Sequence, residues 1–132
     1  MDKDSGMDFM TIMFVGTYTR KLQRGGWVRF PKDWLTLLGD NREVFILPDP
    51  NGRKSLSIAV ADDFRKELKR TEESSKGTRT RRAFVDSAEK VEIAADGRMQ
   101  ISARLLAHAG IQDGVCFAGH IRTIAVTPSH CA

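Results

Sequence analysis

The chain has 132 residues, of which 41% are hydrophobic and 29% are charged, and its formal net charge is +4. This length allows one compact domain, or two small halves that share a core, and excludes separate catalytic and regulatory domains. No apolar run reaches the roughly 18 to 20 residues that a membrane-spanning helix needs. We therefore expect no membrane partner and a cytoplasmic location. Residues 1–12 are too acidic and interrupted for a signal peptide and are expected to be a disordered extension.

Two segments concentrate the positive charge. Residues 20–32 hold five basic residues and no acidic one, and residues 76–82 hold four more, so the rest of the chain is net negative. Concentrated positive charge is expected of a protein that binds a polyanion, although a solvated surface explains it equally well. The basic residues of the first segment are Arg20, Lys21, Arg24, Arg29 and Lys32.

The first structural unit is expected at residues 13–61, and it begins with a short strand, a glycine turn and a second strand. Gly25 and Gly26 suit the positive φ angles of a tight turn. Val28 and Phe30 then alternate with polar residues, which is the pattern of a half-buried strand. This pattern predicts a hairpin with one face in the core and the other in water.

A short helix and two more strands complete the first unit. The helix is expected at residues 31–39, where Gly39 supplies a left-handed stop. Such a helix is too short to be stable alone, so Trp34 must pack on the strands. The strands are expected at residues 41–48 and 55–60.

A longer helix and a basic linker are expected at residues 62–82. Asp62 is the predicted N-cap of a helix over residues 63–75, and the i,i+4 spacing of Phe64 and Leu68 turns both side chains inward. The charged residues of this helix are expected to face solvent.

A second helical stretch is expected over residues 81–88. Arg82 is placed to form an ion pair with Asp86 or Glu89, which is worth about 0.3–0.5 kcal/mol when exposed. The basic residues 76–82 are explained equally well as a solvated linker or as a phosphate contact.

The second structural unit, residues 83–127, repeats the pattern of the first. Laying residues 22–47 over residues 93–118 aligns the turn glycines, the alternating apolar residues and the helix stops. The chain therefore predicts an α+β fold, mainly β, in which one small unit occurs twice. The matching elements are a turn at Asp96–Gly97, an alternating strand through Met99 and Ile101, a helix at 102–110 between the N-cap Ser102 and the stop Gly110, strands at 113–119 and 121–126, and then a tail at 128–132.

The chain from Met13 onward resembles the MraZ family of bacterial transcriptional regulators. The similarity is carried by MFVGTYTRKL at the start, by residues 82–98 and by residues 106–111. It implies tandem AbrB-like swapped-hairpin units that form a double-psi-like β-barrel core with short helices. It also implies a nucleoid-associated homo-oligomer, a ring or another assembly, that binds short promoter repeats of a cell-wall and division gene cluster. The family's opening falls at Met13, so the natural start is Met1 or Met13.

The hallmark of that family is Asp-x-x-x-Arg at each hairpin, with the arginine directed toward DNA. In this chain the first hairpin has Gln23 and Trp27 at those positions, and the second has Ala94 and Arg98. Arg98 alone keeps the hallmark residue type, and we expect it to be the principal DNA contact.

Basic residues near the hairpin tips are the other candidate DNA contacts. Side chains at turn tips reach phosphates without distorting the fold, and arginine also reads guanine edges with two hydrogen bonds. Trp27, if exposed, either stacks on a base or wedges a groove. Otherwise it belongs to the core or an interface, which is the commoner role of an aromatic residue in an alternating strand. The full set of candidates is Arg98, Arg24, Arg29, Arg104, Arg20, Lys21 and Trp27, with Lys32 nearby.

The metal-ligating residue types are scattered. Cys116 and His120 are expected on one strand, which does not direct both side chains to one tetrahedral site, and His130 and Cys131 lie in the tail. We therefore expect no metal and two reduced thiols. His108, on a short helix, is expected to be a structural histidine packed on the core.

No sequence motif predicts catalysis. The chain has no Walker loop, GxGxxG, HExxH or GxSxG. The carboxylate pairs Asp62–Asp63 and Glu72–Glu73 are explained by capping and solvation of a helix. We expect no enzyme activity, no cofactor and no small-molecule substrate. One alternative to a DNA-binding regulator is an oligomeric structural or interaction protein of the same fold that has lost DNA binding. An AbrB-type antitoxin fits less well, because such chains usually carry one copy.

Overall fold

The computed structural model describes residues 13–49, 54–72 and 86–129. Within these ranges the predicted class, α+β and mainly β, is confirmed. None of the helices in this part of the chain is long and apolar enough to span a membrane. The elements in chain order are β1 (Thr17–Lys21), η1 (Arg24–Gly26), β2 (Trp27–Arg29), α2 (Lys32–Leu38), β3 (Glu43–Pro48), β4 (Leu56–Val60), α3 (Ala61–Glu72), β5 (Glu89–Glu92), β6 (Arg98–Gln100), α5 (Ala103–Ala109), β7 (Gly114–His120) and β8 (Thr123–Pro128).

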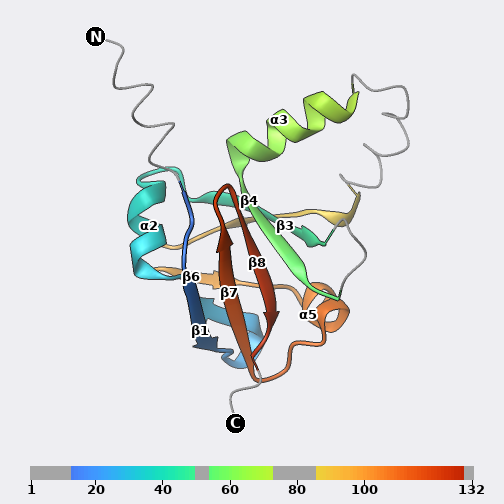
Figure 1. Ribbon diagram of the computed structural model, residues 1–132. Helices are drawn as coiled ribbons and strands as arrows, with labels where there is room; N and C mark the ends of the chain where they lie inside the picture. Colours follow the sequence, from blue (N-terminus) through green and yellow to red (C-terminus); the bar gives the residue numbers. More distant parts are fainter. Residues whose placement is uncertain (1–12, 50–53, 73–85, 130–132) are drawn as a thin grey trace.

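The strands form two antiparallel sheets (Figure 1). Six strands lie in the order β1-β7-β8-β4-β3-β5, and β2 and β6 form a separate two-stranded ribbon. The first strand of each predicted unit pairs with a strand of the other unit, because β1 lies beside β7 and β5 lies beside β3. The ribbon also joins the two units, since β2 belongs to the first and β6 to the second.

The pairing obeys a pseudo-twofold symmetry between the two copies. The register of β1 on β7 becomes that of β5 on β3 when each residue is replaced by its counterpart in the other copy. On the axis of this symmetry, Val28 lies opposite its own counterpart Met99, and Ile58 lies opposite Ile124. The strands β1, β7 and β8 correspond to β5, β3 and β4. Exchanging these counterparts gives the same strand order, counted from the opposite edge of the six-stranded sheet.

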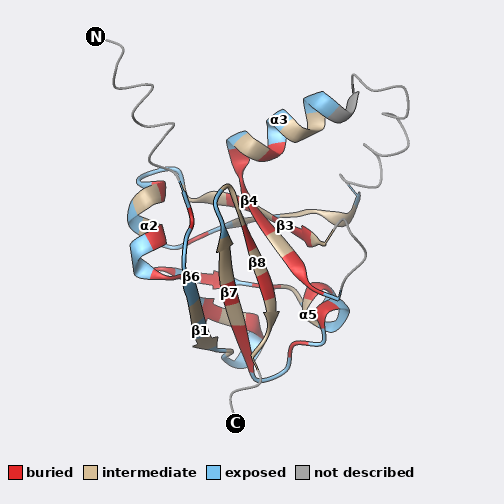
Figure 2. Cartoon of the chain, viewed as in Figure 1, coloured by how far each residue is buried: buried red, intermediate tan, exposed pale blue. Residues whose placement is uncertain are grey.

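One hydrophobic core draws on both copies, and Figure 2 shows its buried residues along the inner strands and on one side of each short helix. Trp34 of α2 is 2% exposed and lies at the centre of an aromatic cluster. Its ring makes edge-on contacts with four others, at centroid distances of 4.9 Å to Tyr18, 5.6 Å to Phe14, 6.0 Å to Phe30 and 6.5 Å to Phe117. The expectation that Trp34 packs the short helix onto the strands is confirmed.

The two short helices end differently. In the second copy, Gly110 has the expected left-handed conformation (φ 69°, ψ 29°), and the N–H of Ile111 donates to the carbonyl of Leu106. In the first copy, Gly39 has φ 61° and ψ −125°, so the predicted left-handed stop is wrong there. The buried Ile111 holds the chain against the core in a Schellman-type ending, whereas the corresponding Asp40 is exposed. The predicted N-cap is confirmed by a 3.3 Å hydrogen bond from the Leu105 N–H to the hydroxyl of Ser102.

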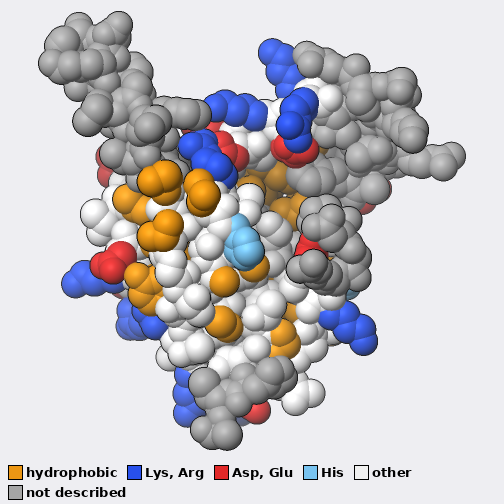
Figure 3. Space-filling view, viewed as in Figure 1, with side chains coloured by type: hydrophobic (Ala, Val, Ile, Leu, Met, Phe, Trp, Pro, Cys, Tyr) orange, Lys and Arg blue, Asp and Glu red, His pale blue; other side chains and the backbone are white. Residues whose placement is uncertain are grey.

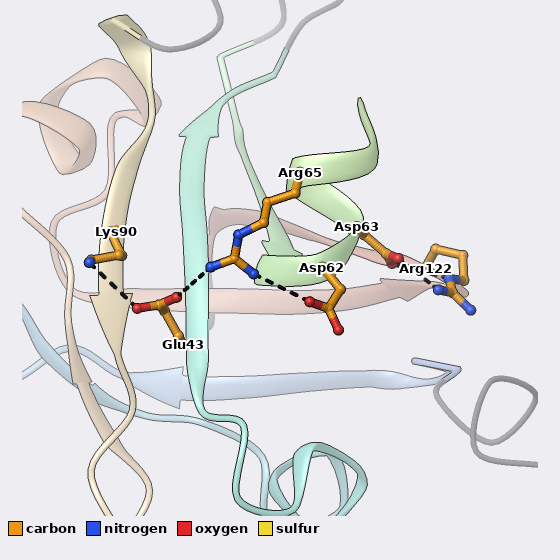
Figure 4. A network of polar contacts seen from close by, with 6 residues as sticks. All are labelled: Glu43, Asp62, Asp63, Arg65, Lys90 and Arg122. Carbon is orange, nitrogen blue, oxygen red and sulfur yellow. Dashed lines mark hydrogen bonds and ion pairs between the residues drawn. The ribbon is translucent and has the colours of Figure 1, made fainter. Parts of the chain in front are cut away.

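Helix α3 begins at Ala61, so Asp62 lies in its first turn and is not the N-cap that the sequence predicted. Asp63 also differs from its prediction as a solvent-facing carboxylate, because its side chain is only 16% exposed and binds Arg122. The guanidinium donates to both carboxylate oxygens, at 2.7 and 3.1 Å, and these bonds raise the pKa of Arg122. Figure 4 shows this pair and the neighbouring network of Glu43, Asp62, Arg65 and Lys90.

The inner side of α3 is apolar, as its spacing predicts. The ring of Phe64 stacks on that of Phe45 with 4.1 Å between centroids. Leu68 packs against the small buried cluster that contains Phe64, Leu47 and Ala59. Of the second predicted helical stretch, Asp86 and Ser87 are helical, and residues 81–85 lie outside the described ranges.

Candidate nucleic-acid interface

The ribbon of β2 and β6 has one face in the core and one in solvent. Val28 and Met99, on the inner face, are 2% and 0% exposed. Because side chains alternate along a strand, the residues on either side of them point outward. We call this outer surface the ribbon face, and it consists of Trp27, Arg29, Arg98 and Gln100.

Arg98 is held in place on the ribbon face by two neighbours. Its guanidinium lies 5.2 Å from the ring centroid of Trp27, a cation–π contact across the ribbon. Its Nε lies 3.3 Å from Oδ2 of Asp96, and its backbone N–H donates to Oδ1 of the same carboxylate at 3.1 Å. The side chain remains 48% exposed, so Arg98 is oriented but accessible.

Arg29 lies directly opposite Arg98 in the ribbon register. Like charges at such positions destabilise a sheet. Asp96 offsets the charge of Arg98, whereas Arg29 donates from Nη1 to the backbone carbonyl of Asp96 at 3.0 Å and pairs with no carboxylate in the described part of the chain. The ribbon face therefore carries a net positive charge that an anionic partner would relieve.

Two glycine turns lie at opposite ends of the ribbon because its strands are antiparallel. The N–H of Gln23 donates to the carbonyl of Trp27 at 2.8 Å, and the N–H of Ala94 donates to that of Arg98 at 2.9 Å. The predicted turn positions are Gly25–Gly26 and Asp96–Gly97. The three glycines among them have the positive φ angles that the sequence predicts. Arg24 is exposed at the tip of the first turn.

Strand β1 and helix α2 bring further cations to one end of the ribbon. Arg20 and Lys32 line a hollow together with Arg29 and the turn that contains Asp96. Lys21 is exposed and points to the other side of β1 from Arg20, by the alternation of the strand. The structure thus brings Arg98, Arg29 and Trp27 onto one surface, with Arg20 and Arg24 beside its ends.

Arg104, another sequence candidate, is engaged elsewhere. From α5 it donates Nε and Nη2 to Oε2 of Glu89, at 3.1 and 2.7 Å, and Nη2 also donates to the carbonyl of Ser87. The sequence predicts an ion pair of Arg82 with Asp86 or Glu89, and Arg82 lies outside the described residues. The prediction for His108 is wrong, because it is exposed on α5 while Leu105 and Ala109 face the core.

Gln100 and Asp96 were not among the predicted site residues. The amide Nε2 of Gln100 donates to the carbonyl of Gly25 at 2.8 Å, which joins the ribbon to the first turn. The strand alternation that points Arg98 outward is the signal that identifies Gln100. The hallmark spacing gives no signal for Asp96, which lies two residues after Ala94, yet the carboxylate of Asp96 binds Arg98.

The opposite side of the molecule has a different character. Figure 3 shows hydrophobic side chains over the surface formed by β1, β7 and β8, with Lys and Arg mainly around its margin. Met13, Val15 and Ile121 are 47%, 61% and 54% exposed. Concentrated cations therefore favour the ribbon face over this surface as a nucleic-acid interface.

The remaining candidate ligands do not gather in the described ranges. Cys116 is a free, partly buried thiol, and no group of three or more metal-ligating side chains occurs in this part of the chain. The predictions for His130, Cys131 and the basic residues 76–82 fall outside it. No protein-family model matches the chain, and no curated protein matches it.

Proposed function

We propose that the chain is a sequence-specific DNA-binding transcriptional regulator that places the β2–β6 ribbon in the major groove. The observation that carries this proposal is the ribbon face, where an aromatic ring, two arginines and a glutamine stand on one surface over a buried apolar pair. The major groove is about 12 Å wide and admits a two-stranded ribbon.

The side chains of the ribbon face suit the edges of base pairs. Arginine donates two hydrogen bonds to guanine, and glutamine both donates to and accepts from adenine. Arg98 is restrained by Asp96 and Trp27, so less side-chain entropy is lost when it binds. Arg24 at one tip and the cations at the other end are placed for the phosphate backbone.

The fold proposed for this function is the MraZ-like one, with swapped-hairpin units and a double-psi-like β-barrel core. The exchange of β1 and β5 between the two copies supports it. We further propose that a nucleoid-associated homo-oligomer binds short promoter repeats of a cell-wall and division gene cluster. Several weak contacts on repeated sites would then add up by avidity.

Salt dependence of DNA binding tests this proposal. DNA sequences selected from genomic fragments should share a short repeat and bind the full chain at low salt. Their affinity should fall linearly with salt on a log–log plot, with a slope of about −0.9 for each phosphate neutralised. An electrophoretic mobility shift series from low to physiological salt measures this slope. Failure to retard any fragment at low salt would contradict the proposal and leave the oligomeric interaction protein as the better description.

A further inference from the structure

A hollow of 420 Å³ opens beside the end of the ribbon that carries the Asp96 turn. Phe30 and Leu35 supply its apolar lining, and the turn from Ala95 to Gly97 forms one side. Its positive side chains come from three separate elements, which are β1, β2 and α2. We call these three side chains the hollow cations, and they are Arg20, Arg29 and Lys32.

The hollow cations are not neutralised within the described part of the chain, where none of them pairs with a carboxylate. Arg20 and Arg29 each donate one hydrogen bond to a neutral backbone carbonyl. Asp96 also lines the hollow, but its two carboxylate oxygens contact Arg98. Asp33, which follows Lys32, accepts a hydrogen bond from the hydroxyl of Tyr18 at 3.2 Å.

Comparison of the two symmetry-related copies shows whether the fold requires these cations. The positions that correspond to the hollow cations in the second copy are Val91, Gln100 and Ala103. Both copies form the same strands and the same short helix, so this scaffold does not require a cation at any of the three positions. The counterpart of the lining residue Ala95 is Arg24, so the equivalent place has one cation at these positions whereas the hollow has three. This excess of positive charge in the hollow points to a ligand.

The chemistry of the hollow selects the class of ligand. Arginine and lysine bind phosphate oxygens through charge-assisted hydrogen bonds. The volume of 420 Å³ falls within the range of about 300–1,000 Å³ that is usual for small-molecule sites, and it exceeds the needs of a lone phosphate. The lining from Phe30 and Leu35 offers an apolar surface for the sugar or base.

We infer that the hollow binds one nucleotide unit, with its phosphate on the hollow cations and its sugar or base on the apolar lining. The nucleotide belongs either to the DNA bound in the proposed function, in which case this inference rests on that function, or to a free nucleoside monophosphate. In both cases the same three cations bind the phosphate.

Titration of the full chain with deoxyadenosine 5′-monophosphate, with deoxyadenosine as the probe that lacks phosphate, tests the free-nucleotide source. NMR shifts of the amides that line the hollow report binding. If the source is free nucleotide, Lys32→Ala and Arg20→Ala should each weaken binding of the monophosphate about tenfold. Lys69→Ala removes the same charge from an exposed position of α3, which does not line the hollow, and should leave binding unchanged. Lys32 is exposed, so its variant still carries the test if Arg20→Ala fails to fold.

DNA affinity measured on the same variants tests the DNA source. Support for it would be a loss of DNA affinity in Lys32→Ala and Arg20→Ala, but not in Lys69→Ala, without binding of the monophosphate. If neither DNA binding nor monophosphate binding changes in the two variants, the inference is overturned. If Arg98→Ala lost DNA binding and the hollow variants did not, the hollow would not be a nucleotide site, and the proposed DNA-binding function would still hold. If the chain bound the monophosphate in the hollow but retarded no DNA, the nucleotide site would be supported and the proposed DNA-binding function would be contradicted.

Discussion

Replacing Gly26 with alanine is expected to destabilise the protein much more than the same change at Gly97, its counterpart in the other copy. The two glycines have nearly equal φ angles, 87° and 92°, so the backbone strain of an added side chain is similar. Their surroundings differ. A Cβ at Gly26 would lie 2.3 Å from the carbonyl oxygen of Ile101, whereas a Cβ at Gly97 would meet nothing closer than 3.5 Å.

Strain alone should cost Gly97→Ala about 1–2 kcal/mol of the free energy of unfolding. The clash with a backbone oxygen should cost Gly26→Ala a further 1–3 kcal/mol or so, because the ribbon must shift. Urea unfolding followed by tryptophan fluorescence measures both values, since Trp34 is buried in the core. Equal destabilisation by the two substitutions would mean that the first turn does not approach the second copy as closely as the structure shows.

The double substitution Arg29→Ala with Arg98→Ala is expected to reduce the affinity for a selected DNA site by about a hundredfold or more, since each well-placed arginine contact is worth roughly 1–3 kcal/mol. The two side chains stand opposite one another on the ribbon face. An arginine that binds a phosphate should also lower the salt slope by about 0.9 when it is removed, whereas one that reads a base should relax sequence preference. Fluorescence anisotropy at several salt concentrations separates these two roles.

The matched control is Arg65→Ala with Arg70→Ala, which removes two positive charges from α3. Both side chains are largely exposed and pair with nearby carboxylates. This control should bind DNA nearly as well as the unmodified chain. If both double variants lost affinity equally, the binding would depend on net charge and not on the ribbon face.

Local sequence signals predicted most of the elements, because turns, caps and alternation are properties of neighbouring residues. Ser102 caps its helix, and Val28 and Met99 face inward as the alternation predicts. Alternation does not identify the partner of a strand, however. The pairing of β1 with β7 therefore had to come from the structure. The same holds for the ion pair of Asp63 with Arg122, which joins residues 59 apart in the chain.

Part of the candidate site was predictable for the same reason. Arg98, Arg29 and Trp27 share a surface because they occupy outward positions of two short strands. The sequence did not show that Arg104 would be bound to Glu89, since that contact depends on where the fold places α5 relative to Glu89. Likewise, Arg20 reaches the hollow only through the position of β1 beside β7.

An NMR titration of the isotope-labelled full chain with a selected duplex shows whether the ribbon face contacts DNA. The largest amide shifts are expected at residues 24–29 and 96–100, whereas the amides of β7 and β8 near Ile121 should shift little. Large shifts on β7 and β8, with none on the ribbon, would mean that DNA binds the opposite surface and not the ribbon face.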